Sequence, residues 1–433
     1  MNRRQLLRRR AITAVATYGS VALGVLGSLI AARELGPTDF GRLSIVIAAA
    51  AFFQVLLDLT VEEAMIKFGF RYSESGRWGK LRRLYRRALV FKALGALAGA
   101  AVLAGGAPLG NRIFGTHGLT VPLLIAAALP LVQAPETLAG AAFVLRSRYD
   151  IRAAFLLVSM LLRLVGFAVG AHFGVAETVL GILLAQAVAS TIVGGAAMRV
   201  FGGLPREAPV SLGDDRREIR RFIVQSSIGS GVVSLRGTLG PLLLGTVTSP
   251  AQVAFFRVAQ APQTGFAALT SPARLILLTE QTRDWERGEP RVVFAGVRRY
   301  SAGAALLMAG AVPLFYWLMP DLIRIAYGDS FSPASDAARI LLLAGALQLV
   351  LAWTKSLPVS IGRPGLRILT HGIETIVLVP LVLVLGAAWD ATGAAVATLI
   401  AAAVFSAVWA VIVVRLARQP HAAPPKAREA PAG

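Results

Sequence analysis

The sequence predicts an all-α membrane protein of about twelve transmembrane helices, arranged as two six-helix repeats around a central cleft. Three observations lead to this prediction: apolar residues come in long blocks, the second half of the chain repeats the first, and basic residues are confined to alternate loops. The chain has 56% hydrophobic residues and a mean hydropathy of +0.66. An ordinary soluble domain has only about 45–50% apolar residues.

The apolar blocks are about 20 residues long, which is the length that a helix needs to cross the hydrocarbon core of a bilayer. Their approximate centres are Leu23, Val55, Leu97, Leu129, Leu162 and Val188 in the first half, and Val233, Phe266, Met308, Gly345, Val377 and Phe405 in the second. The first block is too long for a signal peptide and lacks a small-residue cleavage pattern, so we interpret it as the first span.

The two halves align with a shift of 213 residues. This shift places Pro37 on Pro250, and Phe114-Gly115 on Tyr327-Gly328. Because each half has an even number of predicted spans, both halves enter the membrane from the same side, and the repeats are parallel. The predicted organisation is a basic cytoplasmic N-terminus (1–10), an N-terminal six-helix bundle (11–199), a cytoplasmic linker (200–221), a C-terminal six-helix bundle (222–414) and a disordered cytoplasmic tail (415–433).

The net charge of +21 reflects topology and contact with anionic membrane lipids. Nearly all Lys and Arg residues fall in one set of loops, while the opposite loops hold only Arg33, Arg42, Arg112 and Arg324. The positive-inside rule then places both termini in the cytoplasm. Nucleic-acid binding is not expected, because no basic face is interleaved with stacking aromatic side chains.

No cofactor or metal is expected. The chain has no cysteine, its four histidines lack metal-ligand spacing, and it has no phosphate-binding loop of the Gly-x-x-x-x-Gly-Lys type. The sequence therefore does not predict nucleotide hydrolysis by the chain itself.

Ionisable side chains inside the membrane are costly and usually functional. The predicted spans contain ten of them: Asp58, Glu62, Glu63, Lys92, Glu136, Arg163, Arg236, Arg257, Arg339 and Glu374. Arg163 and Arg236 are near the middle of their spans, and Arg257 and Arg339 lie in the outer third. The 213-residue shift places none of these four arginines on a second arginine.

Single-copy charges on a doubled scaffold indicate function, so we predict that Arg163, Arg236, Arg257 and Arg339 bind an anionic substrate. Guanidinium groups bind phosphate through two parallel hydrogen bonds and stay charged when buried. The alternative is that Arg163 and Arg236 form internal salt bridges with Glu136, Glu374 or Asp58.

Two further features carry weaker predictions. Asp58, Glu136 and Glu374 are candidates for proton or ion coupling, although such carboxylates often serve as hydrogen-bonding or ion-pairing groups. The motif Gly166-x-x-x-Gly170 is typical of a close contact between membrane helices.

The stretch Leu35-Gly36-Pro37-Thr38-Asp39-Phe40-Gly41-Arg42-Leu43, with the later Leu57-Asp58-Leu59-Thr60, resembles the first hairpin of bacterial polysaccharide flippases of the O-antigen type. Thr60 replaces the glycine usual in that family. The segment Val253-Ala254-Phe255-Phe256-Arg257-Val258-Ala259-Gln260 is similar to a second family pattern, with Ala254 and Phe256 in place of Gly and Tyr.

The resemblance implies the multidrug/oligosaccharidyl-lipid/polysaccharide exporter fold, in which two six-helix bundles form a V-shaped cavity. It also implies transport of a polyprenyl-pyrophosphate-linked oligosaccharide across the bacterial inner membrane, from the cytoplasmic to the periplasmic leaflet, with a cationic cavity holding the pyrophosphate. The implied partners are this lipid-linked substrate, membrane lipids, a polysaccharide polymerase and glycosyltransferases.

The sequence fits three other functions less well. A drug/cation antiporter of the same superfamily would need mainly acidic residues in its cavity, whereas the mid-membrane charges here are mainly arginines. A membrane glycan polymerase or ligase would need catalytic groups in a large outward loop, and the predicted outward loops are short. A scaffold without transport leaves the single-copy arginines unexplained.

Overall fold

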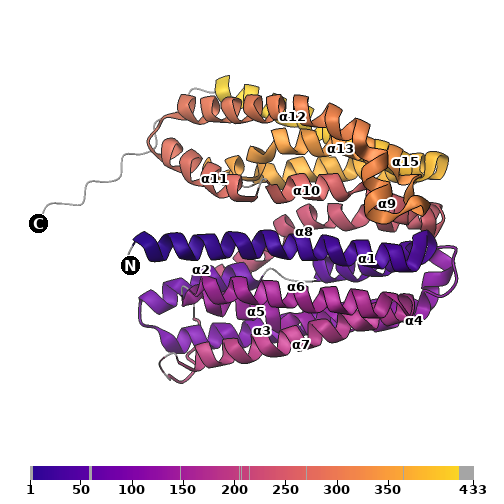
Figure 1. Cartoon of the computed structure of the whole chain (residues 1–433). Helices are drawn as coiled ribbons and strands as arrows, with labels where there is room; N and C mark the ends of the chain where they lie inside the picture. Colours follow the sequence, from indigo (N-terminus) through magenta and orange to yellow (C-terminus); the bar gives the residue numbers. More distant parts are fainter. Residues whose placement is uncertain are drawn as a thin grey trace, which may run out of the picture. The chain divides into compact units, whose positions relative to one another are not determined.

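The computed structural model of the chain describes residues 3–57, 61–146, 148–203, 205, 207–213, 215–269, 271–363 and 365–418 (Figure 1). The regular structure in these residues is entirely helical, with no strand. Seven of the described helices are long and apolar enough to cross a membrane. The prediction of an all-α membrane protein is therefore confirmed.

The helices follow one another with short connections. In chain order they are α1 (Arg3–Leu57), α2 (Val61–Glu74), α3 (Trp78–Ile113), α4 (Thr120–Ala126), α5 (Leu129–Leu145), α6 (Tyr149–Ala171), α7 (Val175–Gly202), α8 (Asp215–Val247), α9 (Pro250–Ala259), α10 (Ala261–Leu269), α11 (Ser271–Glu286), α12 (Pro290–Tyr327), α13 (Ala334–Val350), α14 (Leu357–Ser360) and α15 (Gly365–Arg418). Two 3-10 turns, Asp329–Phe331 and Ala352–Lys355, lie on either side of α13.

Two of the long helices each consist of two helices joined at a kink. In α1 the kink is at Gly36, with φ 69° and ψ 176°, and Pro37 follows it. Glycine adopts a positive φ without penalty, and proline is well suited to begin a helix. In α15 the kink is at Trp389 and Asp390, and Asp390 has a φ of 53°.

All twelve predicted block centres lie within helices, but not every block is a single helix. The block around Leu129 is split between α4 and α5, and the one around Phe266 is split among α9, α10 and α11. Prolines at positions 130, 250, 262 and 272 fall in the first turn of α5, α9, α10 and α11. Proline has no N–H to donate and blocks continuation of the preceding helix, so it divides an apolar block.

The chain forms two compact units. Unit 1 is Met1–Arg257 with Arg324–Phe331, and unit 2 is Val258–Ile323 with Ser332–Gly433. These units differ from the predicted bundles 11–199 and 222–414, because α8 packs against α1 and α2 and thereby joins unit 1. The predicted tail, 415–433, lies outside the described residues from 419 onward.

Unit 1 contains the close helix contact that the glycine motif predicted. A Cβ on Gly166 of α6 would lie 2.5 Å from the Gly181 carbonyl oxygen of α7, and one on Gly170 would lie 2.5 Å from the Thr178 Cα. Any side chain at either glycine would push the two backbones apart. The prediction of a close contact is confirmed.

The repeat is visible in local structure. Gly115 follows α3 with φ 55°, and Gly328, its partner under the 213-residue shift, follows α12 with φ 97°. The turn before α3 contains Gly76 with φ 67°, and the turn before α12 contains Gly288 with φ 74°. The same kind of glycine turn therefore precedes and follows α3 and α12.

Unit 2 has an aromatic core. Its buried residues include Trp353, Phe405 and Trp409, and the two tryptophan rings meet edge to face at 5.4 Å. Trp353 Nε1 donates a hydrogen bond to Ser301 Oγ at 2.8 Å, which satisfies a polar group that would otherwise be buried unpaired.

Candidate functional site

Unit 1 encloses a cavity of about 530 Å³ between α1, α2, α5, α6 and α7. Its apolar lining includes Phe143, Phe155 and Met160. The described polar lining consists of Thr17, Gln54, Glu62, Gln133, Glu136, Arg152, Ser159, Arg163 and Gln186. Polar groups that converge on a cavity with apolar surfaces are typical of a ligand-binding site.

Of the four arginines predicted to bind the substrate, Arg163 of α6 lines this cavity. Its Nε atom is buried and makes no hydrogen bond in the described structure. Glu136 of α5 is the acidic group that acts on it electrostatically. A buried donor without an acceptor loses its hydration and gains nothing in return, so it favours an incoming acceptor.

The second arginine of the cavity is already paired. Arg152 Nη2 lies 3.0 Å from Glu62 Oε1, and half of its side chain is exposed. Among the described residues, the lining thus has two arginines and two glutamates. With all four ionised, these described charges balance.

Three glutamines connect the helices around the cavity. Gln54 Nε2 of α1 donates to Gln133 Oε1 of α5 at 2.6 Å, and Gln133 Nε2 donates to Gln186 Oε1 of α7 at 3.4 Å. Gln186 Nε2 in turn donates to Glu136 Oε2 and to Ser190 Oγ. We call Gln54, Gln133 and Gln186 the amide ladder. Sequence reasoning missed it because amides carry no charge, although amides within apolar blocks are a usable signal.

The polysaccharide biosynthesis protein family matches residues 6–272, which is more than half of the chain. The chain belongs to the polysaccharide biosynthesis protein family. The matched region contains all the residues of the cavity. No curated protein sequence matches the chain significantly.

Solved structures of transporters share the fold of this family member. An inward-facing multidrug resistance MATE family transporter of the MOP superfamily matches with a TM-score of 0.76 and 13% identity, over 94% of this chain and all of the other. The lipid II flippase MurJ in an inward closed conformation matches with a TM-score of 0.73 and 12% identity, over 94% of this chain and 87% of MurJ. A MOP superfamily transporter from Pyrococcus furiosus matches with a TM-score of 0.59 and 13% identity, over 95% and 97% of the two chains.

The family match confirms the resemblance to polysaccharide biosynthesis proteins inferred from the sequence. The fold is that of multi-pass membrane proteins, and the solved structures that share it are transporters and a flippase. The prediction that the chain is not an enzyme agrees with this family and fold.

Two of the other predicted substrate-binding arginines lie elsewhere. Arg257 is exposed in the last turn of α9 and interacts with Tyr327. Arg339 of α13 bonds Asp336 at 3.1 Å and the Tyr316 carbonyl at 3.1 Å, and its guanidinium lies over the Tyr316 ring. Arg236 is in α8, and its side chain is outside the part of the chain that the structure describes. The described lining of the cavity brings Arg163 and Glu136 together and includes neither Arg257 nor Arg339.

Of the predicted coupling carboxylates, Glu136 lines the cavity and Asp58 lies outside the described residues. Glu374 is buried in α15 of unit 2, with its Oε2 atom 3.0 Å from His371 Nδ1. The His371 ring stacks on Phe405 at 4.9 Å. The pairing of His371 with Glu374 was not predicted, although their spacing of three residues on one helix was the available signal.

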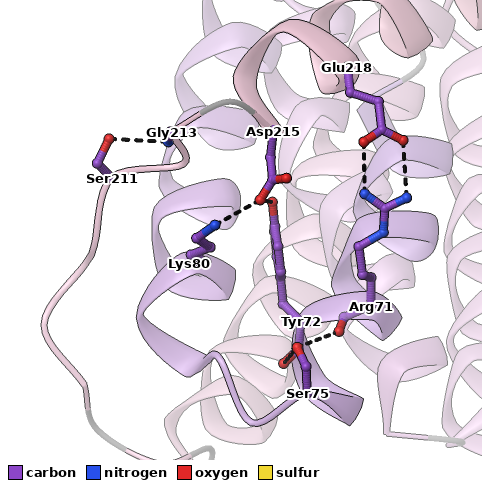
Figure 2. Close-up of polar contacts among 8 residues, drawn as sticks. All are labelled: Arg71, Tyr72, Ser75, Lys80, Ser211, Gly213, Asp215 and Glu218. Atoms are coloured by element: carbon purple, nitrogen blue, oxygen red, sulfur yellow. Dashed lines mark hydrogen bonds and ion pairs between the residues drawn. The ribbon is translucent and has the colours of Figure 1, made fainter.

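The start of α8 is held against α2 and α3 by two sets of polar contacts (Figure 2). Asp215 accepts hydrogen bonds from Lys80 Nζ at 2.8 Å and from Tyr72 Oη at 2.9 Å. Glu218 accepts two from Arg71, at 2.8 and 3.0 Å. We call these five residues the α8 clamp.

The clamp shifts the acid–base properties of its members. The hydrogen bond from Lys80 lowers the pKa of Asp215 below its ordinary value, and the bond from Arg71 does the same for the pKa of Glu218. Burial, followed by the bond to Asp215, raises the pKa of Tyr72. Both carboxylates are therefore ionised and the tyrosine is neutral at physiological pH.

Proposed function

We propose that this protein is a flippase that moves a polyprenyl-pyrophosphate-linked oligosaccharide from the cytoplasmic to the periplasmic leaflet of the bacterial inner membrane by alternating access. The observation that carries the proposal is Arg163, which offers a buried, unbonded guanidinium nitrogen to a cavity lined with amides. It supports the proposal together with the family match and the flippase fold.

The chemistry of the lining suits both parts of such a substrate. Guanidinium binds pyrophosphate oxygens through two parallel hydrogen bonds and keeps its charge when water is excluded. Amide side chains both donate and accept, so the ladder matches sugar hydroxyls, which do the same. In this proposal Arg163, Arg236, Arg257 and Arg339 bind the pyrophosphate at successive stages of transport.

In this proposal, protonation of Glu136 couples proton binding to binding of the substrate. With Glu136 ionised, the charges of the cavity balance; with Glu136 protonated, Arg163 is left in a cationic cavity that favours the anionic substrate. Asp58 and Glu374 are the other carboxylates proposed to couple transport to a proton or ion. Both termini are cytoplasmic in this proposal, and a polysaccharide polymerase and glycosyltransferases act on the same lipid-linked glycan.

One observation favours a drug/cation antiporter as a second candidate. The cavity contains as many glutamates as arginines, and a carboxylate that is hydrogen-bonded by an amide could bind a cationic drug. The two candidates place different residues at the substrate: Arg163 for the glycan, Glu136 for the drug.

The test is export of surface glycan in a strain that depends on this chain, with the membrane level of the protein measured in parallel. Arg163→Ala should reduce export per molecule of protein in the membrane by at least about 100-fold, because removal of a buried charge-assisted contact costs several kcal/mol. Arg163→Lys should restore export only in part, since an ammonium cannot form the two parallel hydrogen bonds that a guanidinium makes to phosphate.

Arg112→Ala is the matched control, since this arginine is exposed at the end of α3 and does not line the cavity. Normal export by Arg163→Ala would rule out the proposal. Normal glycan export combined with loss of drug resistance in Glu136→Gln would instead establish the antiporter.

A further inference from the structure

A second cavity of unit 1, of about 470 Å³, lies between α3 and α8 and has a lining unlike that of the first. Five arginines face it: Arg83, Arg86 and Arg87 of α3, and Arg216 and Arg220 of α8. Every other described residue of its lining is apolar. We call this cavity the arginine pocket.

The arginines gather here because of helix geometry. On α3 they are spaced by three and four residues, and on α8 by four, so each set occupies one face of its helix. The α8 clamp turns the two carboxylates of the same helical turn, Asp215 and Glu218, toward α2 and α3, where they are bonded to Lys80, Tyr72 and Arg71 (Figure 2). Among the described residues that line the pocket there is no carboxylate to neutralise the five guanidiniums.

The floor and one rim of the pocket are hydrophobic. Leu84, Ala88 and Ile219 belong to the buried core beneath it. Val90, Phe91 and Val224 line it and are 51%, 48% and 48% exposed. On α3 the last arginine directly precedes the apolar run that begins at Ala88, so the pocket spans the boundary between a charged and a hydrophobic surface.

One guanidinium of the pocket is incompletely bonded. Arg83 Nε is buried and makes no hydrogen bond within the described structure. Buried polar atoms in proteins are nearly always bonded, so this atom needs an acceptor from outside the described chain. An arginine that only faced water would not bury this nitrogen.

We propose that the arginine pocket binds the head group of an anionic phospholipid from the cytoplasmic leaflet, with its acyl chains lying over Val90, Phe91 and Val224. Basic pockets on the cytoplasmic side of membrane proteins bind such head groups. The lining favours a phospholipid over the lipid-linked oligosaccharide, because its described residues include no amide, hydroxyl or carboxylate for a sugar. This proposal is independent of what the protein transports.

The experiment uses the purified full-length protein in detergent and native mass spectrometry. It measures retention of phosphatidylglycerol, cardiolipin and phosphatidylcholine over a lipid titration. The variant is Arg216→Gln with Arg220→Gln. Its control is Arg217→Gln with Arg221→Gln, which changes the same charge on the same helix at exposed positions outside the pocket. The thermal unfolding midpoint of each variant without added lipid confirms that it is folded.

We expect the pocket variant to weaken binding of phosphatidylglycerol and cardiolipin by about tenfold, and the control to weaken it less than about twofold. Adding Arg83→Gln should weaken binding further. Equal losses in both variants would overturn the proposal, because they would show a general effect of surface charge. Equally tight binding of phosphatidylcholine would also overturn it. Displacement of phosphatidylglycerol by a lower concentration of a polyprenyl pyrophosphate would assign the pocket to a substrate instead.

Discussion

The cavity of unit 1 and the positions that the repeat pairs with it differ sharply in polarity. The 213-residue shift places Arg163 on Ile376 and Glu136 on Leu349. It places the amide ladder, Gln54, Gln133 and Gln186, on Ala267, Ala346 and Leu399. Ala346 and Leu349 are buried in an apolar cluster of unit 2, whereas their counterparts line a cavity.

The two halves therefore share their helices but not their polar side chains. A helix in a membrane needs only apolar residues and satisfied backbone hydrogen bonds, and both halves provide these. Polar side chains at this depth are costly and persist where they have a function. Among the described residues, the cavity with its amide ladder is in the first half, and the pair of His371 and Glu374 is in the second.

The largest effect on stability should come from replacing Arg163 and Glu136 with the residues that the 213-residue shift pairs with them. Arg163→Ile or Glu136→Leu alone leaves one charge without its opposite, which should lower stability by on the order of 2–3 kcal/mol. The double variant removes both charges and should regain most of that stability. The measurement is the thermal unfolding midpoint of the purified protein, and Leu161→Ile on the exposed face of α6 is the control.

Export distinguishes the two roles of this pair. The double variant should remain inactive in glycan export although it is stable, because the substrate contact is missing. Recovery of both stability and export would mean that Arg163 and Glu136 are only a structural pair, and that the polarity difference between the halves has no functional meaning.

A smaller effect is expected at the contact between α6 and α7. The shift pairs Gly166 with Val379, so Gly166→Val again introduces the residue of the second half. The new side chain meets the Gly181 carbonyl, and we expect a loss of about 1–3 kcal/mol from overpacking. Gly195→Ala on α7 has open space around its Cβ and should be neutral or slightly stabilising, as measured by thermal unfolding. A tolerated valine would show that both halves accept the same helix spacing.

The smallest effect should come from the α8 clamp, whose ion pairs are partly exposed, in contrast to the membrane cavity. Asp215→Asn should lower stability by about 1 kcal/mol or less at neutral pH, because Lys80 and Asp215 retain about a quarter of their side-chain exposure. The native pKa of Asp215 is depressed, so its contribution is present above the ordinary aspartate pKa and is lost as the pH falls below about 4.

Unfolding midpoints between pH 7 and pH 3 test this expectation. The difference between the wild-type protein and Asp215→Asn should shrink across the acidic end of that range. A difference that stays constant would show that the clamp acts through packing of Tyr72 rather than through the charge of Asp215.

The sequence by itself determined the membrane class and the positions of the helices. Apolar block length is a local property, and a helix in lipid satisfies its own backbone, so all twelve block centres fell on helices. The positions of proline and glycine likewise account for the breaks within apolar blocks and for the kink at Gly36, because the effects of these residues are confined to their neighbours. The kink at Asp390 had no such signal.

Only the tertiary structure decided which polar groups meet. Gln54 and Gln133 are 79 residues apart, and Gln133 and Gln186 are 53 apart, yet they form one ladder. Arg163 faces Glu136, while Glu374, an equally plausible partner by depth, bonds His371 in the other unit. In the sequence, the five arginines of the arginine pocket resemble the ordinary basic residues of two separate loops. Side-chain pairing across helices depends on how each helix is rotated about its axis and on its neighbours, and hydrophobic block patterns do not encode either.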